Sequence, residues 1–186
     1  MSVSLKELES ELNTLLKPEQ FTDYCPNGLQ LQGCSEIKKI VSGVTACQAL
    51  IDAAVEGNAD VLLVHHGYFW RGEDQTITGL KKNRIQSLLE HEISLFAYHL
   101  PLDAHKELGN NVQLAQKLDF VVEGVLDKSA KNPIVFKGRL QKSHTFNDFM
   151  HFLAARLERE PIGITGSTEK ISTIARCTGA APSTRS

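Results

Sequence analysis

Two neighbouring strands of the expected sheet each end in side chains that bind metal ions. His65 and His66 directly follow a continuously apolar run, and His99 and Asp103 follow the next such run along the chain. Because parallel strands place ligands at their carboxyl ends, we expect these four groups to converge at one edge of the sheet. Imidazole and carboxylate together suit Zn, Fe, Mn, Ni or Co, and the lack of a nearby cysteine in the sequence argues against a thiolate site.

The adjacency of His65 and His66 leaves two arrangements open. Neighbouring residues of a regular strand point to opposite faces, so both can reach one ion only if the chain turns, which Gly67 would permit. Alternatively, each histidine serves a different ion of a two-metal site, and Asp103 bridges the ions through its two oxygens. His99 is interpreted as a ligand, a proton shuttle or an orienting group, and a catalytic role beside the metal is favoured.

Other polar and aromatic residues have simpler interpretations. His105 is expected in a loop, and solvated positions on or next to helices are expected for His91, His144 and His151. Trp70 and Tyr68 would either stack on a substrate ring or pack against their own loop. Asn27 and Gly28 are interpreted first as a turn and second as a functional loop, and for Asp23 a functional role and a surface turn are weighted equally. The sequence has no phosphate-binding GxGxxG or P-loop pattern and no GxSxG elbow.

The first part of the chain alternates between strand and helix patterns. Apolar residues at helical spacing predict a helix over 5–16, capped by Ser4 and ended by Pro18. A short strand is expected at 29–31, and a loop at 67–78. The main alternation has strands at 39–44, 60–64 and 93–98 and helices at 46–56 and 80–91. This β-α-β-α-β order predicts a parallel sheet with right-handed crossovers.

A helix capped by Asn111 and running to 118 is expected to close the first lobe. We therefore expect a first α/β lobe over 1–120 that carries the histidine motifs. A partial second lobe over 121–179 would hold strands at 134–140 and 171–177 and a helix at 145–157, with Thr145 and Asp148 resembling a capping box. The last segment, 180–186, has no apolar periodicity and is expected to be disordered. The fold class is thus α/β, two-lobed and mostly parallel, with helices on both faces and an incomplete second lobe.

Composition excludes several classes of function. The chain has 186 residues, a hydrophobic share of 41% and a net charge of -2, so it lacks the basic stripe of a nucleic-acid-binding domain. No apolar run approaches the roughly 20 residues that span a membrane. The polar, helical N-terminus does not resemble a signal peptide. The four cysteines form no CxxC pair, so we expect free thiols and a cytoplasmic location.

Several motifs in combination resemble one known family. They are Asn27-Gly28-Leu29-Gln30, Gly43-Val44-Thr45, Ala59 to His66, Tyr98 to Asp103, and Asn110-Asn111. The chain is similar to the Nif-three-like family, also called the GTP cyclohydrolase I type 2 homologue family, and most to its bacterial YbgI-type members. The resemblance implies a two-lobed fold, a dinuclear metal centre between the lobes and a ring-shaped homohexamer. His65, His66 and Asp103 match family metal ligands, and His99 matches a family histidine close to them.

The chain departs from the family pattern at about Ala180. The resemblance implies a longer chain whose remaining ligands come from a His-x-x-x-Glu motif near the C-terminus, and no such motif follows Asp103 here. The expectation is therefore a truncated second lobe. Of the recognised ligand set, at most three members would remain.

The favoured hypothesis is a metal-dependent hydrolase that acts on a small nucleotide-like or heterocyclic substrate. Two divalent ions per complete site would activate a water molecule, and His99 would shuttle the proton. The substrate rests only on the family name. The alternatives are a non-catalytic metal-binding regulatory protein and a truncated, inactive copy.

Overall fold

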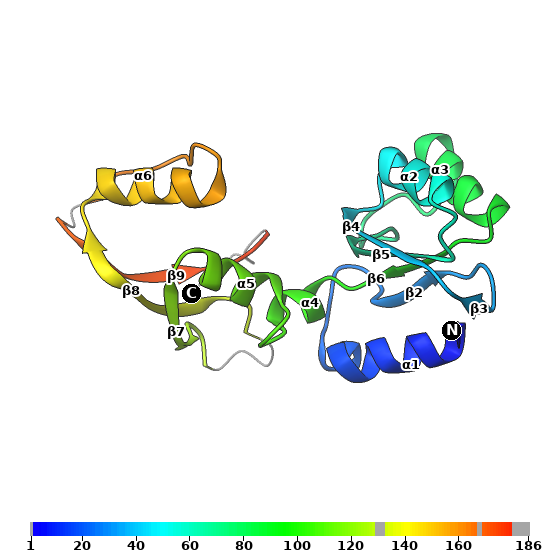
Figure 1. Cartoon of the computed structure of the whole chain (residues 1–186), viewed down its shortest axis with the longest axis horizontal. Coiled ribbons are helices and arrows are strands. Elements are labelled where there is room, and N and C mark those ends of the chain that lie inside the picture. Colours follow the sequence, from blue (N-terminus) through cyan, green and yellow to red (C-terminus); the bar gives the residue numbers. More distant parts are fainter. Residues whose placement is uncertain (1, 129–132, 167–168, 180–186) are drawn as a thin grey trace. The chain divides into compact units, whose positions relative to one another are not determined.

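The computed structural model describes residues 2–128, 133–166 and 169–179. The chain divides into two compact units, Met1–Leu102 and Asp103–Ser186, shown in Figure 1. The sequence pattern predicts a second lobe from residue 121, whereas the observed division falls earlier. It does so because helix α5 (Asn110–Lys117) packs against strand β7 (Phe120–Val125), and both belong to the second unit. The segment 180–186, which is expected to be disordered, lies outside the described residues.

The first unit is built on a four-stranded sheet with the order β2-β6-β5-β4. Its strands are β2 (Gly28–Leu31), β4 (Ile40–Thr45), β5 (Val61–His66) and β6 (Ser94–Ala97). β4, β5 and β6 are parallel, which confirms the predicted β-α-β-α-β pattern. β2 is an antiparallel edge strand that pairs with β6.

Helices cover both faces of this sheet (Figure 1). α1 (Leu5–Leu16) lies on one face, and α2 (Gln48–Glu56) and α3 (Gly79–Glu90) lie on the other. Alternate residues of β5 therefore enter two separate apolar clusters. Leu62 and Val64 pack beneath α2 and α3, whereas Val61 packs with α1. A strand that is apolar at successive positions is the expected product of such double coverage.

Local signals set the ends of α1. Ser4 and Glu7 form a complete capping box, in which the Ser4 hydroxyl accepts from the Glu7 N–H and the Glu7 carboxylate accepts from the Ser4 N–H. The helix ends at Lys17, which has a left-handed backbone and is followed by the short 3-10 helix Pro18–Gln20. The predicted helix is thus confirmed. Two short strands that the sequence pattern misses, β1 (Val3–Ser4) and β3 (Glu36–Ile37), pair beside it.

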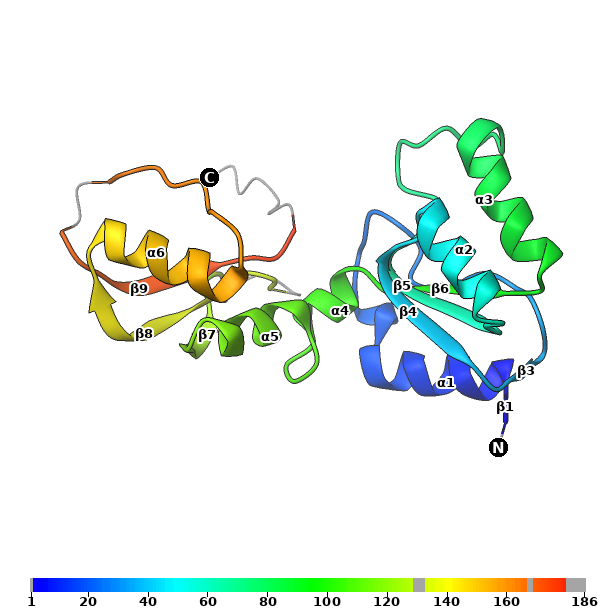
Figure 2. The same ribbon diagram turned by 45° about the horizontal axis from the view of Figure 1, so that its top comes forward.

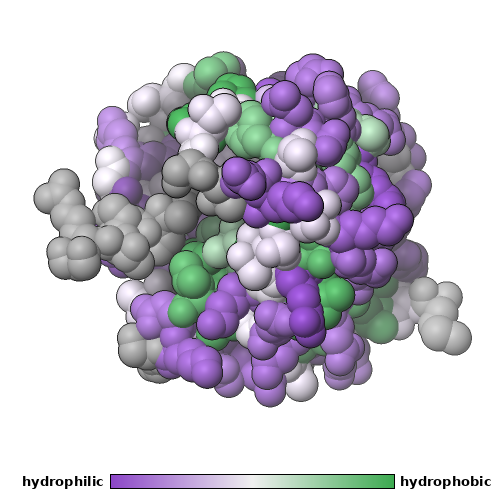
Figure 3. Space-filling model, turned by 90° about the vertical axis from the view of Figure 1, so that its left-hand side faces the viewer, coloured by the Kyte–Doolittle hydropathy of each residue, from purple (hydrophilic) through white to green (hydrophobic). Residues whose placement is uncertain are grey.

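The second unit holds an antiparallel sheet with the order β7-β8-β9. Figure 2 shows α6 (Phe146–Leu157) lying along β8 (Phe136–His144) and β9 (Ile171–Arg176). Residues of α5, α6, β7 and β9 share one small apolar cluster. The parallel arrangement expected from the sequence is therefore confined to the first unit. Figure 3 shows the face that is turned to the left in Figure 1. This face is mostly hydrophilic, and smaller hydrophobic patches lie among the hydrophilic residues.

Helix starts in the second unit partly match the prediction. Thr145 caps α6 by accepting from the Asp148 N–H, as expected. The prediction that Asn111 caps a helix is wrong, because Gly109 is the cap of α5 and Asn111 lies fully buried inside the helix. Its side chain instead bonds to other segments, as described below. Among the described helices, none is both long and apolar enough to cross a membrane.

Candidate metal centre

His65 and His66 are the last two residues of β5, and their rings lie together. The ring centroids are 4.4 Å apart, and His66 still pairs with Thr45 of β4. The expectation that two adjacent strand residues need a chain turn to converge is wrong here, because the strand continues through both. At the end of a strand the side chains can lean along the strand direction. The role of Gly67 also differs from a turn, since a Cβ there would overlap Gln30 and Ala97.

His99 follows β6 and joins the pair, which confirms that the two strand ends meet. Its ring centroid lies 5.0 Å from that of His65 and 5.7 Å from that of His66. One ligand atom of each of the three imidazoles lies within 4.8 Å of the other two, a spacing that can hold a metal ion. We call His65, His66 and His99 the histidine cluster.

Each ring of the histidine cluster has its Nδ1 beside an oxygen. His65 Nδ1 lies 3.0 Å from the Tyr98 carbonyl, His66 Nδ1 lies 3.2 Å from the Thr45 hydroxyl, and His99 Nδ1 lies 2.8 Å from Asp23 Oδ1. A carbonyl oxygen only accepts, so His65 must donate from Nδ1, and the lone pair of its neutral ring is on Nε2. Oxygen partners of this kind orient histidines that bind metal through the other nitrogen. The donor set therefore fits a divalent transition metal.

Asp23 is a site residue that the sequence interpretation missed. Its side chain is 3% exposed, although the sequence pattern indicates an ordinary turn. Burial raises the pKa of Asp23, but hydrogen bonds from His99, Asn27 and two backbone N–H groups outweigh burial and lower the pKa to about 2. The carboxylate is therefore ionised at neutral pH. The only sequence signal was the neighbouring Asn27-Gly28 motif.

Cys25 also lies near this cluster, so the expectation that no cysteine is close is wrong. Its thiol groups with Asp23 and His99 at metal-ligand spacing. Burial, and then the charge of Asp23, raises the pKa of the Cys25 thiol to about 12. The thiol is thus protonated at neutral pH, whereas metal ligation requires the thiolate. All four cysteines are free, as predicted.

The loop after β5 places an indole against the cluster. The Trp70 ring centroid lies 4.9 Å from that of His99 and 5.9 Å from that of His66, both edge to face. Trp70 Nε1 donates to the Gly67 carbonyl, and the Trp70 N–H donates to Glu73, so the loop holds the ring in place. Tyr68 is instead a core residue whose hydroxyl donates to the Ala46 carbonyl. Of the two candidates for stacking, only Trp70 borders the histidines.

Asp103 lies in the second unit, within the short helix α4 (Leu100–Ala104), and is 2% exposed. Its Oδ1 accepts from Asn110 Nδ2 at 2.9 Å and from Thr178 Oγ1 at 2.8 Å. Asn111 supports the same segment, donating to the Asp103 and Ile134 carbonyls and accepting from the Thr178 N–H. The carboxylate is therefore held in one orientation by groups of its own unit. A role as a metal ligand remains a prediction.

The remaining histidines lie elsewhere. His91 is exposed at the end of α3, and His151 is exposed on α6, as expected. His105 accepts from two backbone N–H groups of its loop. His144 is not simply solvated, because its ring packs against Phe152 with centroids 5.2 Å apart.

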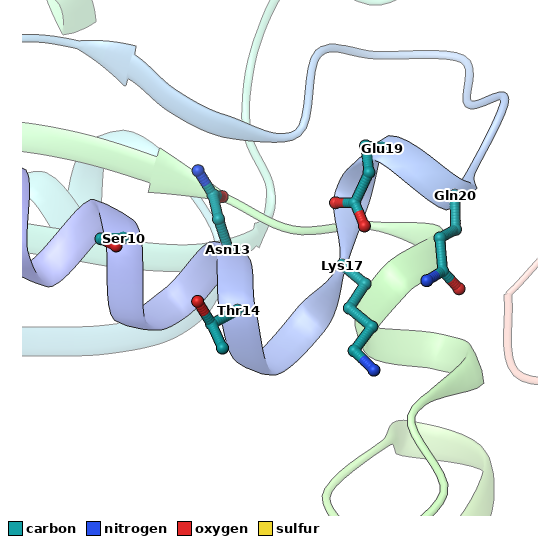
Figure 4. A pocket seen from close by; sticks show the side chains of 6 residues that line it. All are labelled: Ser10, Asn13, Thr14, Lys17, Glu19 and Gln20. Carbon is teal, nitrogen blue, oxygen red and sulfur yellow. The ribbon is translucent and has the colours of Figure 1, made fainter.

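A separate pocket lies at the end of α1 (Figure 4). It is shallow, and it is lined by polar and charged residues, namely Ser10, Asn13, Thr14, Lys17, Glu19 and Gln20. None of these residues belongs to the histidine cluster. This pocket is therefore separate from the carboxyl edge of the sheet, where such folds usually bind ligands.

The first unit is an α/β fold with helices on both faces of its sheet, and three imidazoles lie at the carboxyl ends of its parallel strands. These features place the protein in the class of α/β proteins with a candidate metal centre. The chain belongs to the Duf34/NIF3 (NGG1p interacting factor 3) family, whose model matches residues 3–185. It is 49% identical over 181 residues to a Pseudomonas aeruginosa protein named GTP cyclohydrolase 1 type 2 homolog, covering 97% of this chain and 71% of that one.

Solved structures support the same assignment. The protein ybgI, described as of unknown function, is 45% identical and superposes with a TM-score of 0.89, over 95% of this chain and 70% of that one. A protein from Thermus thermophilus is 33% identical with a TM-score of 0.78, over 92% of this chain and 68% of that one. The family expected from the sequence motifs is thus confirmed.

Proposed function

We propose that this chain binds a divalent transition-metal ion at the histidine cluster of its first unit. The observation that supports this most is the shared environment of the three rings, each with Nδ1 beside an oxygen. His65 and His66 would ligate through Nε2. Asp103 is proposed as a further ligand because it matches a family ligand position and its carboxylate is held by Asn110 and Thr178.

The donor set limits the metal without naming one. Imidazole nitrogens with a carboxylate suit Zn, Fe, Mn, Ni or Co. The family resemblance implies two ions per complete site and a homohexamer. Both stay predictions. Elemental analysis of the purified protein would measure the number of ions, and light scattering would measure the oligomeric state.

Hydrolysis is the reaction class that this arrangement favours. The cluster would hold a divalent ion, and such an ion would supply Lewis-acid chemistry toward a carbonyl or phosphoryl oxygen of a substrate. His99 is the proposed proton acceptor beside the ligands, because its ring joins those of His65 and His66 and it matches a family histidine close to the ligands. Trp70 borders the same rings and offers an apolar wall for a flat substrate. The name of the Pseudomonas relative points to a purine nucleotide as the first substrate to try.

Metal binding can be tested through the only tryptophan of the chain. Because Trp70 borders His66 and His99, Co²⁺ bound at the cluster should quench its fluorescence and produce visible absorption bands. His65→Ala should weaken Co²⁺ binding at least about 100-fold. His91→Ala is the matched control, because His91 Nδ1 also lies beside a carbonyl, that of Ser87, but outside the cluster. Equal quenching in the His65→Ala and wild-type chains would contradict the proposed site.

Hydrolysis needs a separate test. The chain loaded with each metal in turn is incubated with GTP, and ring opening is followed by ultraviolet absorbance and mass spectrometry. We expect turnover that falls about 100-fold or more in His99→Gln, since a positioned proton acceptor contributes on this scale. Metal binding without any turnover would contradict the hydrolase proposal and favour a non-catalytic metal-binding role.

A further inference from the structure

We propose that Asp23 is a positioning residue for His99, which holds the ring by its Nδ1–H and so keeps the lone pair on Nε2. Only the use of Nε2 as a proton acceptor rests on the proposed function. The positioning of the ring by Asp23 does not depend on it. The hydrogen bonds that carry it lie within the first unit. Asp23 and His99 are 76 positions apart in the sequence, so the pairing is a product of the fold.

Each oxygen of the Asp23 carboxylate accepts two hydrogen bonds. Oδ1 accepts from His99 Nδ1 at 2.8 Å and from its neighbour's N–H, that of Tyr24, at 2.6 Å. Oδ2 accepts from the Leu100 N–H and from Asn27 Nδ2, both at 2.9 Å. Four bonds match the roughly four lone-pair sites of a carboxylate. Asp23 therefore has a fixed orientation, and it is a poor candidate for binding a metal itself.

The surrounding backbone fixes the relative positions of the two residues. Asn27 Oδ1 accepts from the His99 N–H at 2.7 Å. The segment that carries Asp23 and Asn27 therefore binds both the backbone and the ring of His99. From the other side, Arg71 donates its N–H to the Tyr24 carbonyl at 2.6 Å and its Nη2 to the Asp23 carbonyl at 3.1 Å. The pair is thus held between two neighbouring segments, and one of these carries Trp70.

The charge state of Asp23 decides which ring nitrogen carries the proton. Three of its four partners, the Tyr24 and Leu100 N–H groups and the Asn27 amide nitrogen, can only donate, which favours an ionised carboxylate. An ionised carboxylate can only accept, so His99 Nδ1 must donate. In the neutral ring, Nε2 is then the acceptor. The ring is thereby prepared to receive a proton at Nε2, as in other histidines oriented by a carboxylate.

The tautomer can be read directly in solution. We would record long-range ¹H–¹⁵N spectra of the ¹⁵N-labelled full chain without metal, at a pH where the histidine rings are neutral. The His99 signals are assigned by their loss in His99→Gln. We expect the Nδ1–H pattern for His99. The Nε2–H pattern, or an even mixture of both tautomers, would overturn the inference.

Two variants separate positioning from folding. In Asp23→Asn an amide replaces the carboxylate, so we expect His99 to lose the pure Nδ1–H pattern. Asp60→Asn is the matched control, because Asp60 also accepts from two backbone N–H groups, those of Lys38 and Lys39, outside the cluster. It should leave the His99 signals unchanged. Should Asp23→Asn not fold, the wild-type spectrum still decides. An unchanged tautomer in folded Asp23→Asn would overturn the inference.

This experiment can fail independently of the proposed function. A chain that shows the Nδ1–H pattern but binds no Co²⁺ supports the role of Asp23 and contradicts the metal site. A chain that binds Co²⁺ while its His99 shows the Nε2–H pattern supports the metal site and overturns the role of Asp23.

Discussion

The two units of this molecule stabilise their sheets in different ways. In the first unit, helices cover both faces of a largely parallel sheet, and every residue of β6 is buried. In the second unit, one small apolar cluster joins α5 and α6 to the antiparallel sheet, and α6 has no fully buried residue. Ile162 and Ile164 of that unit are 100% and 91% exposed. The histidine cluster is therefore held by the more deeply packed unit, which favours precise positioning.

The largest expected difference between the units lies in their cores. Leu95→Ala removes a fully buried side chain of β6 and should lower the free energy of unfolding by about 3 kcal/mol. Leu153→Ala removes a half-buried side chain of α6 and should cost about 1 kcal/mol. Urea unfolding followed by Trp70 fluorescence reports the first change, and hydrogen exchange of α6 reports the second. Equal costs would show that the two cores are equally well packed.

Buried amide side chains give the next largest contrast. Asn111 is fully buried and makes three hydrogen bonds within the second unit, so Asn111→Ala should cost about 2 to 3 kcal/mol. Gln30 likewise makes three bonds, to Pro26 and Tyr68, but it is half-buried, so Gln30→Ala should cost about 1 kcal/mol. Thermal unfolding measures both. A larger loss for Gln30→Ala would contradict the reasoning from burial.

Helix caps should give the smallest effects. Ser4→Ala removes the hydroxyl that accepts from the Glu7 N–H, while the Ser4 backbone N–H can still donate to the Glu7 carboxylate, and it should cost about 1 kcal/mol. Thr145→Ala removes a single cap of α6 and should cost less, about 0.5 kcal/mol. Chemical denaturation of both variants, with Ser4→Asp and Thr145→Ser as conservative replacements, checks the order. Failure of those replacements to restore stability would show that the hydroxyls do not act as caps.

The sequence predicted the first unit better than the second for a physical reason. Its central strand β5 is apolar from Val61 to Val64 and its helices repeat at regular spacing, so burial of this strand on two faces leaves a clear pattern. β7 was missed because Val121 and Val122 are exposed and its register shifts before Gly124. The antiparallel pairing of β7, β8 and β9 depends on contacts that no local pattern records.

The histidines of the candidate site were predictable from the sequence, and the residues that support them were not. His65, His66 and His99 follow strands whose ends must meet, and the structure brings them together. The local sequence does not decide between a turn and a functional role for Asp23, because its partner His99 lies 76 positions away. Thr178 was not singled out for the same reason, since its hydroxyl reaches Asp103 over 75 positions. Support of this kind is decided by tertiary structure.

The metal content of the purified chain tests the proposed metal centre most directly. Elemental analysis after growth in metal-replete medium would compare the wild-type chain with the double variant His65→Ala/Asp103→Ala. We expect at least one transition-metal ion per wild-type chain and essentially none in the variant, while both remain folded by circular dichroism. A wild-type chain with no metal, or with no more than the folded double variant, would contradict the proposed metal centre.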